Sequence, residues 1–260
     1  INQQTKWVNW VKSNRFNGSI RNTIHPYYLI YDKAKFNFNN YKKLNDDLQD
    51  HNMNCLYVDG EYFSHRIFEM DKELAWVAAY FNELIEYNLI NDIAIPKKII
   101  ISTSLGTSLF ENIAKIKAIF VVTNTIINAH GIKSSIEIET SFNRIDVSPL
   151  EKEHHILRLT VACMSSIIAG SIRIKLANHD AIFEENYWKK IACNIPLILK
   201  EESYLFIDDD ASKGCYIVNQ IERMLSESAW TKFKEIEKNG GLCSSSNKKI
   251  FQKLKGRRLL

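Results

Sequence analysis

Short apolar runs rich in β-branched residues alternate along this chain with longer amphipathic segments. Four runs predict β-strands, with 27–31 (YYLIY) as a weaker candidate: 55–59 (CLYVD), 98–104 (KIIISTS), 134–141 (SSIEIETS) and 171–177 (SIRIKLA). Apolar residues between Leu74 and Ile85 recur at steps of three and four, which predicts a helical face. Similar periodicity predicts helices over 108–129, 150–168, 183–202 and 216–238.

The repetition of strand, helix and strand predicts a parallel sheet covered by helices. Four or five strands are visible, fewer than a closed eight-stranded (β/α) barrel requires. A doubly wound sheet is the alternative, although no glycine-rich phosphate loop follows any strand and the chain has nine glycines. The pattern alone therefore gives the α/β class and no more.

Composition narrows the class of protein further. The 260 residues are 45% hydrophobic and 25% charged, with a formal net charge of +4, as in ordinary soluble globular proteins. That charge is too mild to indicate nucleic-acid binding, and we interpret the basic end 248–258 (KKIFQKLKGRR) as a solvated tail or helix. No apolar run is long enough for a membrane span. We therefore expect a cytoplasmic protein, and the start at Ile1 suggests a longer natural chain.

The sequence contains no complete catalytic or metal-binding motif of the common types. The chain has no GxSxG, HExxH or Walker motif, and its five cysteines form no CxxC pair, so we expect reduced thiols. His154 and His155 are neighbours, which point in different directions on a helix, so a surface pair is favoured over a metal site. The run 208–210 (DDD) is favoured as a solvated turn over a cation site. We accordingly predict no catalytic residue and no metal ligand.

Several segments in order nevertheless resemble the methylmalonyl-CoA mutase family. The segment 109–118 (LFENIAKIKA) resembles E-I-A-K-L-R-A after an aromatic pair, and 190–203 (KIACNIPLILKEES) resembles R-I-A-R-N-x-x-L-I-L-x-E-E-S. The segment 213–217 (KGCYI) stands where the family has G-S-Y-Y-I, and 229–241 (AWTKFKEIEKNGG) is similar to A-W-x-x-F-x-E-I-E-x-x-G-G. The stretch 55–80 ends in E-L-A-W, similar to E-L-A-Y. The resemblance covers about residues 50–241.

The resemblance implies a fold and a function. Members of this family fold as a (β/α) barrel that takes the CoA chain of the substrate through its centre, while a separate cobalamin domain supplies the radical chemistry. Heterodimeric members pair an active subunit with an inactive small subunit. We therefore expect an α/β fold of the mutase type, a partial parallel (β/α) barrel over 51–241, after an N-terminal arm with first elements (1–50) and before a basic tail or helix (242–260).

Departures from the family pattern lie where the active subunits bind substrate. Active members carry a Tyr-His pair before the E-L-A-Y helix, whereas this strand end reads V-D-G-E-Y, ending at Tyr62, with His65 further along. The strand that resembles R-x-H-x-Q-T-S has Ser135, Glu137 and Glu139 in place of the arginine, histidine and glutamine, followed by Thr140 and Ser141. Two glutamates would repel the phosphates of CoA.

A second strand departs in the same way. The glutamine and histidine of G-x-T-Q-S-L-H map onto Ile172 and Lys175, and the cobalt-ligand motif D-x-H-x-x-G is missing. However, successive side chains of a strand point to opposite faces of the sheet. This alternation places Arg173 and Lys175 on one face and Ile172 with Ile174 on the other. If alternation holds, Arg173 and Lys175 reach Glu137 and Glu139 and fill the barrel centre with ion pairs; if the family alignment holds, Ile172 points to the centre. The candidate barrel-centre or ligand-facing residues are Tyr62, Ser135, Glu137, Glu139, Ser141, Ile172, Arg173 and Lys175.

These expectations favour a non-catalytic small-subunit-like chain that supports a catalytic large subunit in a heterodimer, or self-associates. The resemblance implies that adenosylcobalamin belongs to the partner subunit, and that this chain binds no cofactor. One alternative is an active acyl-CoA mutase barrel that uses a cobalamin domain on another chain. Another is an acyl-CoA or anion-binding module that uses Arg173, Lys175 or the basic tail. Nucleic acid and membrane are not expected partners.

Overall fold

In the part of the chain that the structure describes, five parallel strands form one sheet in the order β1-β2-β3-β4-β5. The computed structural model describes residues 20–22, 42, 54–64, 67–142, 152–171, 173–175, 186–205, 210–242 and 244. The strands are β1 (Ile20–Asn22), β2 (Asn54–Val58), β3 (Lys98–Leu105), β4 (Ser135–Phe142) and β5 (Arg173–Lys175). Because each strand lies beside the strand that precedes it, without a reversal of order, the described sheet follows barrel winding and not doubly wound winding.

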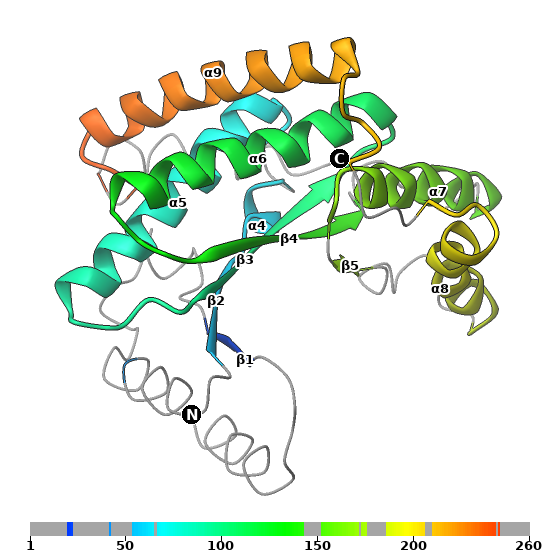
Figure 1. Ribbon diagram of the computed structural model, residues 1–260, viewed down its shortest axis with the longest axis horizontal. Coiled ribbons are helices and arrows are strands. Elements are labelled where there is room, and N and C mark those ends of the chain that lie inside the picture. Colours follow the sequence, from blue (N-terminus) through cyan, green and yellow to red (C-terminus); the bar gives the residue numbers. More distant parts are fainter. Residues whose placement is uncertain are drawn as a thin grey trace, which may run out of the picture.

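Helices cover one face of this sheet in two layers (Figure 1). They are α4 (Glu61–Ser64), α5 (Met70–Ile90), α6 (Leu109–Ala129), α7 (Lys152–Ile168), α8 (Asn186–Glu201) and α9 (Tyr216–Lys238). Helices α5 and α6 run along the sheet, and α9 packs on the outside of both. Among the described helices none is long and apolar enough to cross a membrane.

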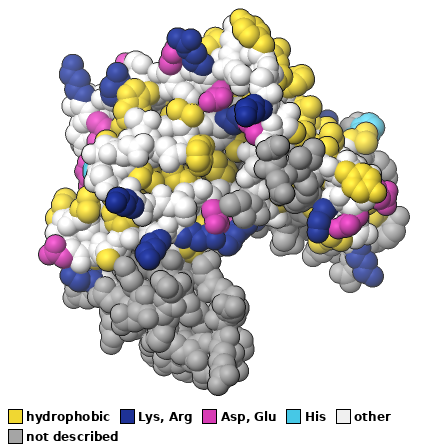
Figure 2. All heavy atoms as spheres, viewed as in Figure 1, with side chains coloured by type: hydrophobic (Ala, Val, Ile, Leu, Met, Phe, Trp, Pro, Cys, Tyr) yellow, Lys and Arg dark blue, Asp and Glu magenta, His cyan; other side chains and the backbone are white. Residues whose placement is uncertain are grey.

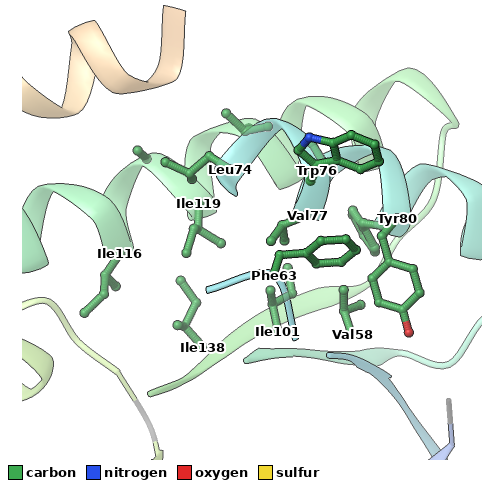
Figure 3. Packing of buried hydrophobic residues seen from close by; sticks show 14 of the residues in the cluster. Val58, Phe63, Leu74, Trp76, Val77, Tyr80, Ile101, Ile116, Ile119 and Ile138 are labelled. Carbon is green, nitrogen blue, oxygen red and sulfur yellow. The ribbon is translucent and has the colours of Figure 1, made fainter. Parts of the chain in front are cut away.

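The main core lies between the sheet and its first helical layer (Figure 3). Alternate strand residues, among them Val58, Ile101 and Ile138, point toward α5 and α6 and are at most 6% exposed. The Phe63 ring stacks on Trp76 at 6.3 Å between centroids. Each fully buried side chain of this size contributes about 1.5–3 kcal/mol, so this layer supplies most of the cohesion of the sheet.

Helix α9 docks through a single stripe and ends in a glycine pair. Its buried residues Val218, Ala229, Phe233 and Ile236 lie on one helical face. After the helix, the Gly240 N–H donates to Glu237 O and the Gly241 N–H donates to Ile236 O. Both glycines have positive φ, at 90° and 72°. This is a Schellman motif, which explains why the chain places two glycines here.

The predicted strands and helices of the described part are largely confirmed. Strand β1 and the short helix α4 were not predicted, because three or four residues give no periodic signal. The weaker strand candidate 27–31 and the basic end 248–258 lie outside the described residues. Figure 2 shows basic and acidic side chains interspersed over the described part of one face.

Candidate functional site

The sheet face opposite the helices carries a row of polar and charged side chains. The strand register places Tyr57, Ile100 and Glu137 in one row across β2, β3 and β4. It places Ser102, Glu139 and Arg173 in a second row across β3, β4 and β5. Ser104, Ser141 and Lys175 form the next row, toward the carboxyl ends of the strands. Ligands of parallel α/β proteins bind at this end of the sheet, so this face is the candidate site.

A lysine from β5 organises the centre of the face. The Lys175 ammonium lies 2.9 Å from Glu139 Oε1, 2.8 Å from the Tyr57 hydroxyl and 3.4 Å from Glu61 Oε2. The Tyr57 hydroxyl, which accepts from Lys175, donates to Glu139 Oε1 at 3.1 Å. Glu139 is 1% exposed, whereas the Lys175 side chain is 29% exposed. Residues from β2, α4, β4 and β5 thus form one connected network, which we call the Lys175 network.

Tyr57 and Lys175 of the Lys175 network are both held in their protonated forms. Burial raises the pKa of Tyr57 above its ordinary value of 10.0, although the hydrogen bond with Lys175 opposes the rise. Burial acts to lower the pKa of Lys175, but the hydrogen bonds to Tyr57 and Glu139 together outweigh it, and the pKa ends above its ordinary value. At neutral pH the phenol is therefore protonated and the ammonium charged. Neither group can accept a proton from a substrate.

The other candidate residues on this face lie outside the Lys175 network. Glu137 lies 2.5 Å from the ammonium of Lys98 on β3. Ser135, at the start of β4, is exposed, and its hydroxyl donates to the carbonyl of Lys97. The buried hydroxyls of Ser104 and Ser141 have no hydrogen-bond partner among the described residues. Lys175 therefore pairs with Glu139 as alternation predicts, whereas Glu137 pairs with a lysine that the sequence did not single out.

The remaining candidates lie elsewhere or outside the described residues. Tyr62 of α4 packs its ring against Phe63 at 5.4 Å and belongs to the hydrophobic core. Arg173 is partly exposed on the polar face, and Ile174 packs against the core on the other. Ile172 and His65 lie outside the described residues. The side chains of Arg173–Lys175 therefore alternate between the two faces of the sheet, as the strand pattern predicts.

Sequence reasoning missed Tyr57 and Glu61, both of which contact Lys175. The position of Tyr57 could have been predicted from Leu56-Tyr57-Val58. Side chains alternate along a strand, so if Leu56 and Val58 face the core, Tyr57 faces the opposite side of the sheet. Glu61 follows a tight turn at Gly60, where a Cβ would lie 2.3 Å from the Ser102 carbonyl oxygen. Only glycine fits this close approach, so Gly60 lets the chain bring Glu61 over the end of the sheet.

The segments that carry the family resemblance build a second buried network, on the helix side. The Lys115 ammonium lies 2.7 Å from Glu73 Oε2 and donates to Ser104 O at 2.8 Å. The Ser64 and Thr103 hydroxyls donate to Glu73 Oε1 at 2.5 and 3.3 Å. Both charged side chains are at most 6% exposed. We call this the Glu73–Lys115 network; it ties α4, α5, β3 and α6 together.

The asparagine of the same segment anchors a loop. The Asn112 side chain accepts from the Gly106 N–H at 3.0 Å and donates to the Gly106 carbonyl at 2.9 Å. It also donates to Ser165 of α7 at 3.4 Å. The loop between β3 and α6 is therefore fixed to both neighbouring helices.

The aspartate run at 208–210 and the histidine pair at 154–155 were the other polar clusters considered in the sequence. Asp210 accepts hydrogen bonds from Ser212 and pairs with Lys117 at 2.8 Å, which explains it as a turn residue; Asp208 and Asp209 lie outside the described residues. His155 is buried and His154 exposed, so the expectation of a surface pair is wrong for His155, because α7 turns that ring inward. No group of three His, Cys, Asp or Glu residues in the described part could hold a metal ion.

Fold and site together define a parallel α/β protein of barrel winding whose polar sheet face is neutralised by its own charges. The family model of methylmalonyl-CoA mutase matches residues 61–255, and this chain belongs to that family. It is 26% identical over 192 residues to the methylmalonyl-CoA mutase small subunit of Porphyromonas gingivalis, covering 71% of this chain and 31% of that one.

Other relatives point to the same family. The small subunit of Streptomyces virginiae is 33% identical over 89 residues, covering 34% of this chain and 14% of its own length. The methylmalonyl-CoA mutase of Cereibacter sphaeroides is 22% identical over 198 residues, with 73% and 28% covered. The chain thus spans less than a third of the length of these curated relatives.

Proposed function

We propose that this chain is a non-catalytic, small-subunit-like component that supports a catalytic methylmalonyl-CoA mutase subunit. The observation that carries the proposal is the Lys175 network on the polar face of the sheet. The only cationic groups of β5, Arg173 and Lys175, face this side, and Lys175 is held by three internal partners. A ligand would have to compete with those partners.

The energetic cost of separating Lys175 from its partners disfavours binding of a ligand to this face. Glu139 is buried, so drawing Lys175 away toward a ligand would leave an uncompensated carboxylate, at a cost of about 2–3 kcal/mol because water can approach the exposed side of the lysine site. A CoA ester also brings phosphates close to Glu137 and Glu139, where like charges repel. The proposal therefore assigns this chain no acyl-CoA substrate of its own.

In this proposal the partner subunit binds adenosylcobalamin and carries out the interconversion of methylmalonyl-CoA and succinyl-CoA. The proposal assigns the cofactor to the partner because the sequence of this chain lacks the D-x-H-x-x-G motif. The names of the small-subunit relatives support pairing with a large subunit. Free thiols at Cys55, Cys163, Cys193 and Cys215 support a cytoplasmic location.

Co-purification combined with assays of the isolated chain tests the proposal. The full chain is expressed with a catalytic mutase subunit from the same source, and size-exclusion chromatography follows the pair. We expect co-elution, and no turnover or CoA-ester binding by the isolated chain in calorimetry with methylmalonyl-CoA. Turnover by the isolated chain, once a cobalamin domain and adenosylcobalamin are added, would establish the active-barrel alternative. Calorimetric binding of the ester without turnover would establish the binding module instead.

A further inference from the structure

Five large apolar side chains are exposed where the helices α5, α6 and α9 begin. Phe68 comes two residues before α5, Phe110 lies in the first turn of α6, and Tyr216 with Ile217 begins α9. Met224 follows about two turns further along α9. In chain order the five side chains are 56%, 46%, 79%, 49% and 63% exposed. We call these five residues the helix-start surface.

Two buried contacts bring the beginnings of the three helices together. The Glu73–Lys115 ion pair joins the early turns of α5 and α6. Val218 of α9 packs in one cluster with Ile113 and Ala114 of α6. Because α5 and α6 follow β2 and β3 in the chain, both helices begin at the carboxyl end of the sheet. Figure 1 shows that α9 begins at the same end.

The exposed apolar side of α9 faces the beginning of α5. Ile217, Met224 and Ser228 are separated by seven and four residues, a spacing that places them on one side of the helix. The Ser228 hydroxyl donates to Asp71 of α5 at 2.7 Å. Phe68 precedes Asp71 by three residues. The five side chains therefore belong to one region of the surface.

The size of the helix-start surface is that of a protein interface. Exposed apolar residues that are scattered singly need no explanation, whereas a large apolar patch marks an interaction site. At about 150–250 Å² for a large side chain, these exposures leave about 600 Å² of side-chain surface in contact with solvent. A stable complex buries about 800 Å² on each partner. The helix-start surface therefore supplies most of one interface before any polar rim is added.

The charges around this surface are mixed. Glu69 and Lys72 form an ion pair at 2.9 Å with both side chains half-exposed. Glu111 and Lys213 are exposed and carry opposite charges. Protein interfaces have an aromatic-rich centre and a polar rim, whereas a membrane-binding helix carries an excess of Lys and Arg beside its apolar face. The balance of charge therefore favours another protein as the occupant.

We propose that the helix-start surface binds the catalytic mutase subunit, with Tyr216 and Met224 at the centre of the contact. This occupant rests on the proposed function, which gives the chain a catalytic subunit as its partner. Tyr216 is the most exposed of the five, and tyrosine is enriched among the residues that dominate binding energy. The flexible side chain of Met224 can adapt to the shape of a partner. Binding then takes place outside the polar sheet face.

Calorimetric titration of the full chain with the catalytic subunit from the same source tests the surface. Y216A removes an exposed ring and M224E places a charge in the apolar centre, so each should weaken the affinity about tenfold. The two positions are about 12 Å apart along α9, so the effects should combine to about a hundredfold in Y216A/M224E. The matched control L197E changes a similarly exposed leucine of α8 and should keep the wild-type affinity.

A third position protects the test against a folding failure of the α9 variants. F68A changes the surface outside any helix and should also weaken the affinity about tenfold. Circular dichroism compares the fold of each variant with that of the wild type. If the wild type binds and the folded variants bind equally well, the surface is overturned and the proposed function stands.

Two other results would also overturn the surface. A wild-type chain that does not bind the catalytic subunit would contradict the proposed function, and the surface would lose its occupant with it. Sedimentation velocity of the isolated chain tests for a second copy as the occupant. Self-association that M224E abolishes, while the catalytic subunit still binds that variant with wild-type affinity, would assign the surface to a homodimer.

Discussion

Two buried ionic networks lie on opposite faces of one sheet and differ in what surrounds them. The Glu73–Lys115 network lies on the helix side, with both charges at most 6% exposed and their remaining bonds made to Ser64, Thr103 and a carbonyl of β3. The Lys175 network lies on the polar face, where Glu139 is buried but the lysine is 29% exposed. The first is sealed within the fold, and the second reaches the surface.

The two networks differ in how their residues relate to the family pattern. Glu73 and Lys115 belong to segments that resemble the mutase family, and in this chain they join α5 and α6 to β3. Glu139 and Lys175 stand where the chain departs from the family pattern. Resemblance and departure therefore fall on different faces of the described sheet, which supports the proposed non-catalytic role.

The largest expected effect comes from breaking the sealed pair. K115M should lower the free energy of unfolding by about 3–5 kcal/mol, because it leaves the Glu73 carboxylate buried without a compensating charge. Urea denaturation followed by circular dichroism measures this loss.

The double variant E73L/K115M is the matched control. It removes both charges and should recover much of the loss, because an apolar pair of similar volume is often as stable as a buried ion pair. A loss below about 1 kcal/mol in K115M would show that the network contributes no more than a surface pair does.

A smaller loss is expected on the polar face. K175M should cost about 2–3 kcal/mol in the same urea experiment, since Glu139 loses its charge partner but water can approach through the exposed side of the lysine site. If K175M costs as much as K115M, the polar face is as sealed as the core and the contrast between the two networks disappears. K200M, at an exposed lysine of α8, controls for the loss of a positive charge.

Sequence reasoning predicted the scaffold better than the networks. The long helices were predictable because their apolar faces repeat over four or more turns, and β5 was predictable because Arg173 and Lys175 alternate with Ile174. The Lys175–Glu139 contact followed from that alternation. The partners Lys98, Tyr57 and Glu61 did not, because a lone charged or aromatic residue gives no signal of what it faces.

The Glu73–Lys115 pair illustrates the same limit. The two residues are 42 positions apart, and each lies on a helix where a charged residue is ordinarily assigned to the solvent side. Burial of both followed only from packing α5 and α6 onto the sheet. The resemblance marked these segments as important but gave no role to either charge.

The smallest effect is expected at the ion pair that joins α5 to the outer helix α9. Asp71 and Lys232 join α5 to α9 with side chains 25% and 32% exposed, so D71N should cost about 1 kcal/mol at pH 7. The sign of the pH dependence is fixed by the direction of the shift: the pKa of Asp71 is lowered below 3.8, so its contribution is present above that pH and is lost as pH falls through the folded value. Urea midpoints of wild type and D71N should therefore differ at pH 7, and the difference should shrink as pH falls below 3.8. A difference that does not shrink with falling pH would mean that Asp71 stabilises the helix pair by packing and not by charge, and the graded series from sealed to exposed pairs would end at Lys175.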